Sequence, residues 1–178
     1  MEIQKLIFLL VNVAGGAAVI GSYIAGIVSH PALVNNLWGK VTPLSKAMYM
    51  SLMPLAAIGY LIFASYILFQ LDARKALVAN IYGYEIFSII FIAILLPSAL
   101  WMPLSLKVQE TGDMQLWWAV RIVLFVVGLA ALALLAALLM LNQKDPALFY
   151  WLAVGGAAIF FVQTGIVDAF IWPVLYRG

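Results

Sequence analysis

Long apolar stretches alternate with short polar segments along the whole chain. Each of five stretches, at about residues 6–29, 46–70, 80–104, 115–141 and 148–174, is long enough to cross a hydrocarbon layer about 30 Å thick as a helix. The fourth stretch is continuously apolar and rich in Ala and Leu, whereas the strands of a membrane barrel would alternate apolar and polar residues. The pattern predicts an all-α, integral membrane bundle of five transmembrane helices, with residues 1–178 in a single domain.

The composition agrees with this prediction and excludes several other classes of protein. Hydrophobic residues make up 67% of the 178 residues and charged residues only 9%, which is far from the average for a soluble domain. The net charge of +2 is not gathered into a basic cluster, so no nucleic acid is expected as a partner, and the lipid bilayer is the expected surrounding. The absence of cysteine excludes disulfides and thiolate metal sites.

The connecting segments distinguish two sides of the membrane. An odd number of spans places the termini on opposite sides, and we call the side of the N-terminus side one and the other side two. The longest connection, roughly His30 to Ser45, lies on side two and is called loop one below. Lys and Arg residues are equally frequent on both sides, so the positive-inside rule predicts no orientation. We therefore expect a multi-pass membrane protein, in a membrane that the sequence does not identify.

Small residues recur along one face of the first predicted helix. Ala17, Gly21 and Ala25 follow one another at a spacing of four residues, which places them on the same side of an α-helix. Such a face lets helix backbones approach closely in lipid, so we expect it to pack against another helix of the bundle. Association of two copies of the chain through this face is the alternative.

Three ionisable residues lie within the predicted spans: Glu85, Arg121 and Asp168. Each is costly to keep in the membrane and needs a partner or a function. Arg121 and Asp168 are about equally deep, on the order of 9 Å from side two at the rise of an α-helix, and we expect them to form an ion pair. The alternative is that Arg121 extends to the headgroups while Asp168 bonds a hydroxyl group or water. Glu85 falls in the first turns of its helix, where the dipole favours a carboxylate, so a structural role is expected.

Five of the six tryptophans and the single histidine lie near side two. Thr164, Asp168 and Trp172 share a helix face, and Trp118 stands three residues before Arg121, within cation–π reach. An aromatic pocket with one charged pair suits a flat, mostly apolar ligand that carries a polar group, although a membrane-interface belt is the alternative for many of these rings. The candidate ligand-binding residues are Tyr23, His30, Trp38, Tyr60, Trp101, Trp118, Arg121, Thr164, Asp168 and Trp172.

No catalytic or metal-binding motif accompanies this cluster. The chain lacks paired metal ligands, a Gly-rich phosphate loop and a serine with a plausible histidine base. His30 is more often a hydrogen-bonding loop residue than a ligand in such a context. The sequence identifies no cofactor, and an intramembrane enzyme is the least favoured class.

Several short segments resemble those of one known family. They are Trp38 with Pro43 in loop one, the run from Met53-Pro54 to Gly59-Tyr60, Trp101-Met102-Pro103, and Asp145-Pro146-Ala147 through Trp151. With five helices, a long first loop and abundant tryptophan, the chain resembles the TspO/MBR family of tryptophan-rich sensory or translocator proteins. The family's doubled loop proline and its Ala-x-x-Leu-Asn stretch are absent, and this chain reads Gln163-Thr164-Gly165 at the latter place. The resemblance implies a protein that binds or transports porphyrins, sterols or other apolar ligands beneath loop one.

Two functions follow from these patterns. The first is the binding or transport of a small apolar ligand, porphyrin-, sterol- or lipid-like, in a pocket on the loop-one side of the bundle. The second is a structural or accessory subunit of a larger membrane complex, with the small-residue face of the first helix as its interface; a homodimer would use the same face.

Overall fold

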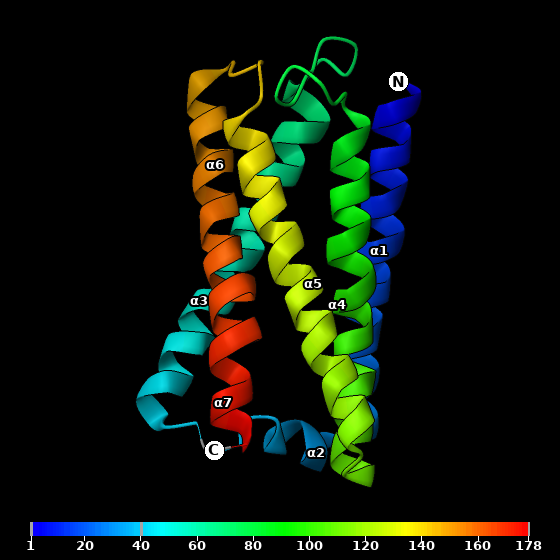
Figure 1. Cartoon of the computed structure of the whole chain (residues 1–178), viewed down its shortest axis with the longest axis vertical. Coiled ribbons are helices and arrows are strands. Elements are labelled where there is room, and N and C mark those ends of the chain that lie inside the picture. The colour runs from blue at the N-terminus through cyan, green and yellow to red at the C-terminus, as the bar shows by residue number, and fades with distance from the viewer. Residues whose placement is uncertain (1, 40, 178) are drawn as a thin grey trace.

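The computed structural model describes residues 2–39 and 41–177, and five long helices run side by side through it (Figure 1). The chain is 83% helical, and the described residues form no strand. The helical elements are α1 (Ile3–Ser29), α2 (Pro31–Asn36), α3 (Pro43–Ser65), α4 (Glu85–Thr111), α5 (Met114–Leu139), α6 (Ala147–Phe161) and α7 (Trp172–Arg177), with two π-helical segments, η1 (Tyr66–Gln70) and η2 (Val162–Ile171). Five continuous helical segments are long and apolar enough to cross a membrane, so the predicted five-helix bundle is confirmed.

Local sequence sets the helix ends near side two. α3 begins at Pro43, whose fixed φ suits the first helical position, and the Thr42 hydroxyl accepts a hydrogen bond from a backbone amide of the first turn at 3.2 Å. α4 ends at Thr111 and is followed by Gly112, which has a left-handed φ of 66°. α5 begins directly after Asp113, whose carboxylate accepts from the Gln115 amide at 2.7 Å. Consequently α4 and α5 are joined by a tight turn rather than by a loop.

The third span differs from the predicted residues 80–104, because α4 begins at Glu85 and continues to Thr111. Pro97 and Pro103 lie inside this helix, and neither ends it. Each proline removes one backbone hydrogen bond. The last turns of α4 nevertheless bury apolar side chains such as Leu106 against the bundle. This burial favours a helix over the connecting segment that the predicted spans leave after residue 104.

The five spans form an arc with α1 and α3 at its two ends. α1 packs against α4, α4 against α5, α5 against α6 and η2, and α6 against α3. Toward side one the ends of the arc meet, since the Tyr60 hydroxyl of α3 donates to Asn12 Oδ1 of α1 at 2.6 Å. At side two α3 leans away from the other helices, and α2 crosses the end of the bundle (Figure 1). The two termini lie at opposite ends, as an odd number of spans requires.

Close backbone contacts between glycines hold this arc together. Gly59 of α3 lies against Gly156 of α6, where a Cβ on Gly156 would come within 2.9 Å of the Gly59 backbone. Gly128 of α5 lies against Gly165 of η2, where a Cβ on Gly128 would come within 2.8 Å of the Gly165 Cα. Because lipid is as apolar as the helices themselves, close packing of this kind is the main source of helix association.

The predicted face of α1 does not pack against another helix of the described chain, and association of two copies through it stays a prediction. Ala17, Gly21 and Ala25 are exposed, and a Cβ on Gly21 would meet no atom within 4 Å. α1 instead contacts α4 through Gly15 and Gly26, where added Cβ atoms would lie 2.7 Å from side chains of α4. These two glycines share a face because their separation corresponds to about three full turns, whereas Gly21 lies about a third of a turn away.

The connection between η1 and α4 is held by two amide side chains from the turn between α5 and α6. The Gln143 side chain exchanges two hydrogen bonds with the Asp72 backbone, both at 3.0 Å. The Asn142 side chain bonds two backbone groups of residues 75–77, at 2.8 and 2.9 Å. The side-one end of the bundle is therefore closed by ordered backbone.

Replacing Gly156 with Ala should lower the stability of the bundle by about 1–3 kcal/mol, because the new Cβ would press on the Gly59 backbone. The adjacent Gly155 provides a matched control, since a Cβ there would meet nothing within 4 Å. Gly155→Ala should leave stability unchanged or raise it slightly through helix propensity. Thermal unfolding in detergent, followed by circular dichroism, measures both variants, and equal midpoints would contradict the proposed contact.

Candidate functional site

Two clusters of buried apolar side chains fill the bundle, and polar residues of the last span lie at their boundary. The cluster toward side one is rich in aromatic residues and includes Phe91, whereas the cluster toward side two includes Trp172. Gln163 and Asp168 belong to neither cluster. η2 therefore carries an amide and a carboxyl group where the two apolar clusters meet.

The π-helical geometry of η2 brings Gln163 and Asp168 together. A π-helix bonds residue i to residue i+5, so residues five apart fall on one face. The Gln163 amide nitrogen accordingly donates to Asp168 Oδ1 at 2.9 Å. In an α-helix the same two side chains would point about 140° apart, so α-helical spacing does not predict that Gln163 belongs to the site. The only signal in the sequence was an amide residue within an apolar span.

Tyrosines from two other helices lie near Asp168. Tyr23 of α1 and Tyr49 of α3 both interact with it electrostatically. Tyr49 is buried, and its hydroxyl donates to the Val167 carbonyl at 3.1 Å, which ties α3 to η2 beside Asp168. Tyr23 is 36% exposed, so it connects the interior of the bundle with its outer surface. Tyr49 was not among the predicted residues.

A chain of aromatic rings continues from Tyr23 toward loop one. The Tyr23 ring stacks on Trp101 with centroids 5.6 Å apart, and Trp101 meets Trp172 edge to face at 5.7 Å. On the α3 side, Trp38 of loop one meets Tyr49 at 6.0 Å. The structure thus gathers Tyr23, Trp101, Trp172 and Asp168 into one region, to which Trp38 is joined through Tyr49.

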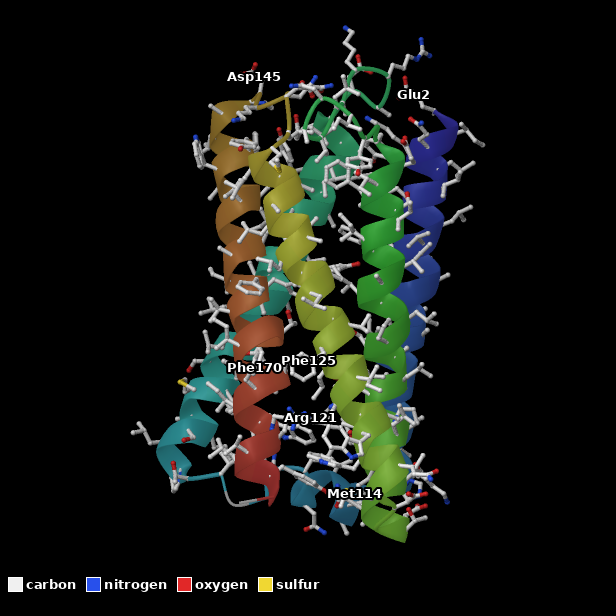
Figure 2. The ribbon with its side chains drawn as sticks, viewed as in Figure 1. Glu2, Met114, Arg121, Phe125, Asp145 and Phe170 are labelled. Carbon is white, nitrogen blue, oxygen red and sulfur yellow. The ribbon has the colours of Figure 1, made fainter. Side chains whose placement is uncertain are left out.

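The expected ion pair between Arg121 and Asp168 is not formed. No ion pair among the described side chains includes either residue. The Arg121 guanidinium lies over the Phe125 ring, 5.5 Å from its centroid, beside Phe170 and between α5 and the last span (Figure 2). Equal depth was not sufficient, because the wider turns of η2 pair Asp168 with Gln163 of its own helical segment instead.

Several polar atoms in the side-two half are buried without a hydrogen-bond partner among the described residues. They are the indole nitrogen of Trp101, the Ser105 hydroxyl, Arg121 Nε and the side-chain carbonyl of Gln163. Leaving such a group unsatisfied costs about 1–3 kcal/mol. These atoms belong to α4, α5 and η2, and each could accept or donate a hydrogen bond to a further polar group.

Loop one is fastened to the bundle by hydrogen bonds to its backbone. The Trp172 indole nitrogen donates to the Leu37 carbonyl at 3.0 Å, and the Gln109 side chain donates to the Leu33 carbonyl at 2.9 Å. Leu37 itself is buried in the side-two cluster. Trp172 therefore joins the aromatic rings near Asp168 and also fastens loop one to the bundle.

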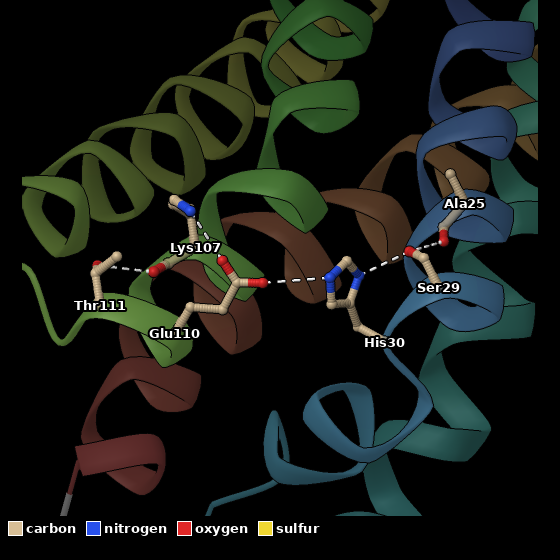
Figure 3. A network of polar contacts seen from close by, with 6 residues as sticks. All are labelled: Ala25, Ser29, His30, Lys107, Glu110 and Thr111. Carbon is tan, nitrogen blue, oxygen red and sulfur yellow. Dashed lines mark hydrogen bonds and ion pairs between the residues drawn. The ribbon is translucent and has the colours of Figure 1, made fainter.

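His30 belongs to a separate network at the side-two end of α1 and α4 (Figure 3). Its Nε2 lies 3.2 Å from the Glu110 carboxylate, which also binds Lys107 at 2.9 Å, and its Nδ1 lies 2.7 Å from the Ser29 hydroxyl. The network links the ends of two packed helices. His30 is therefore placed with a structural contact rather than with the ring cluster.

Three other predicted residues are not brought into the cluster. Trp118 is 59% exposed and points away from the bundle. Tyr60 lies toward side one, where it is bonded to Asn12 and packs on the aromatic cluster. Thr164 satisfies its hydroxyl within its own helix, by donating to the Phe160 carbonyl at 2.8 Å.

Two open grooves lie away from this region. One, of about 670 Å³, includes Glu2, Lys5 and Phe69 at the side-one end, and the other, of about 350 Å³, includes Ile58 and Leu152 on α3 and α6. Neither corresponds to the pocket expected beneath loop one. The described residues contain no group of three side chains suited to a metal ion.

No protein-family model matches this chain, and no curated protein or solved structure matches it either. The resemblance to the TspO/MBR family therefore stays a prediction.

Replacing Trp172 with Phe should loosen loop one, because it keeps the ring but removes the donor to the buried Leu37 carbonyl. We expect faster amide exchange in residues 31–37 and a loss of stability of about 1–3 kcal/mol. Hydrogen–deuterium exchange with mass spectrometry measures the first effect. Trp118→Phe, at an exposed tryptophan, is the matched control. The same exchange rate in both variants would show that the indole hydrogen bond does not hold the loop.

The His30 and Glu110 side chains should be coupled only weakly, by less than about 1 kcal/mol, because they are 41% and 33% exposed. A double-mutant cycle with His30→Ala and Glu110→Gln measures this coupling energy through thermal unfolding. Lys107→Ala, which removes the other partner of Glu110, is a comparison within the same network. A coupling of several kcal/mol would mean that the pair is far less hydrated than its exposure indicates.

Proposed function

We propose that this protein binds a small, mostly apolar ligand within the membrane and acts as a binding or transport protein for it. The site is the region around Asp168, beneath loop one. The observation that carries the proposal is that four elements meet beside this carboxylate. Gln163 bonds it, Tyr49 bonds the adjacent Val167 carbonyl, and the Tyr23 ring stacks on Trp101, which packs on Trp172.

General properties of helical membrane proteins support this assignment. Ligand sites in bundles lie between helices, with apolar walls and a few convergent polar groups. Ionisable residues inside a span are costly and usually mark a functional site, and π-helical segments occur frequently at such sites. Asp168 combines both features, since it is an intramembrane carboxylate on η2. The resemblance to the TspO/MBR family makes porphyrin-, sterol- and lipid-like molecules the first ligands to test.

A thermal-shift experiment on the detergent-purified chain tests the proposal. The panel contains protoporphyrin IX, cholesterol, a long-chain alcohol and 1-naphthylmethanol, and at least one compound should raise the unfolding midpoint in a saturable manner. Trp101→Leu should abolish that shift, because Trp101 joins Tyr23 to Trp172 at the centre of the cluster. The control Trp118→Leu, at an exposed ring, should retain it. No shift with any compound, or equal loss in both variants, would contradict the proposal.

A structural or accessory subunit of a larger membrane complex is the second candidate. The exposed face of α1 favours it, because Ala17, Gly21 and Ala25 offer a smooth surface that no helix of this chain covers. This function predicts that Gly21→Leu disrupts an assembly with other chains while leaving the bundle intact. A chain that is stable only together with other subunits, and that responds to none of the ligands, would favour it.

A further inference from the structure

We propose that the ligand of this site is a lipophilic organic cation, an aromatic molecule carrying a protonated amine, bound by the Asp168 carboxylate and the rings of Tyr23 and Trp101. The inference rests on the proposed function, because it assigns a ligand class to the same site.

The charge of Asp168 is the first argument. The carboxylate receives a hydrogen bond from the Gln163 amide but takes part in none of the ion pairs among the described side chains. The nearby intramembrane cation, Arg121, lies instead against the Phe125 ring. A carboxylate removed from water is costly unless an opposite charge accompanies it. A cationic ligand supplies that charge, whereas an anionic ligand would add a second negative charge.

The neighbouring hydrogen-bond acceptor is the second argument. Gln163 is only 4% exposed, and its amide nitrogen already donates to Asp168. Its carbonyl oxygen is buried without a partner among the described residues, and it belongs to the same amide that bonds the carboxylate. A carboxylate and an amide carbonyl in one region suit a group with several N–H donors, which is what a protonated amine provides.

The aromatic rings are the third argument. Tyr23 and Trp101 stack 5.6 Å apart, and Trp172 meets Trp101 edge to face. The faces of such rings attract ammonium groups and also pack against flat apolar molecules. A carboxylate bordered by rings therefore matches a molecule that is both aromatic and cationic.

The route of entry agrees with a lipophilic molecule. Loop one is bonded to the bundle through the Leu33 and Leu37 carbonyls, which covers the side-two end. Tyr23 is 36% exposed on α1, which packs against α4 and stands apart from the side-two end of α3 (Figure 1). A molecule dissolved in the bilayer can reach this ring from the lipid side.

Three probes that share one ring system test the proposal: 1-naphthylmethylamine, 1-naphthylmethanol and 1-naphthylacetate, which are cationic, neutral and anionic at neutral pH. Their dissociation constants for the full chain in lipid nanodiscs are measured by calorimetry. The amine should bind at least about tenfold more tightly than the alcohol, and the acetate more weakly than both, because only the amine pairs with the partly buried carboxylate.

Asp168→Asn should remove the preference for the amine while leaving the affinity for the alcohol nearly unchanged. Asp145→Asn makes the same change at an exposed carboxylate on side one and should preserve the preference. If Asp168→Asn does not fold, Tyr23→Leu provides a second variant, because this half-exposed residue can change without filling the core. It should weaken binding of the amine about threefold more than binding of the alcohol, since only the cation gains from the ring face.

Equal affinity for the three probes, or an amine preference that survives both Asp168→Asn and Tyr23→Leu, would overturn the inference. The proposed function would still stand if the alcohol binds and Trp101→Leu prevents it. Absence of binding by all three probes would overturn the inference, and the compound panel described above then decides the proposed function separately.

Discussion

Helices of this composition gain little free energy by leaving lipid for one another, so the bundle depends on how closely their backbones can approach. The contact between Gly59 and Gly156 joins α3 to α6, and the contact between Gly128 and Gly165 joins α5 to the last span. The second contact lies within η2, the π-helical segment that carries Asp168. The interaction that holds the last span in place therefore also fixes the position of the candidate site.

The polar residues of η2 are tolerated because protein rather than lipid surrounds them. The Gln163 amide donates a hydrogen bond to one oxygen of Asp168. The Tyr49 hydroxyl donates to the Val167 carbonyl, one residue before Asp168. Irregular helix geometry at membrane depth is acceptable where it is covered by neighbouring helices or borders a site. η2 meets this condition, since it packs against α5 and is reached by Tyr23 from α1. Its departure from α-helical geometry is thus part of the arrangement that gathers the polar groups.

Hydrophobic patterning predicted the five spans because span length and apolarity are properties of single segments. Hydrophobic patterning does not predict which helix faces pack against one another. The exposed Gly21 looks like the packed Gly26 in sequence, and only the position of α4 distinguishes them. In the site, counting depth along the chain put Asp168 and Arg121 at the same level, but the prediction that they pair assumed α-helical turns throughout. The π-helical turns brought Gln163 to Asp168, which no periodicity in the sequence predicts.

The two ends of the bundle are built with different strength, and this difference bears on where a ligand can enter. Toward side one, Asn142 and Gln143 bond the neighbouring backbone at four points, and Tyr60 joins the two ends of the arc. Toward side two, loop one depends on single side-chain bonds to carbonyls, such as that from Trp172, and α3 leans away from the bundle. Segments with few such contacts open more readily than the rest of a fold. A ligand that needs one side of its site to move would therefore meet less resistance at the end where Asp168 lies.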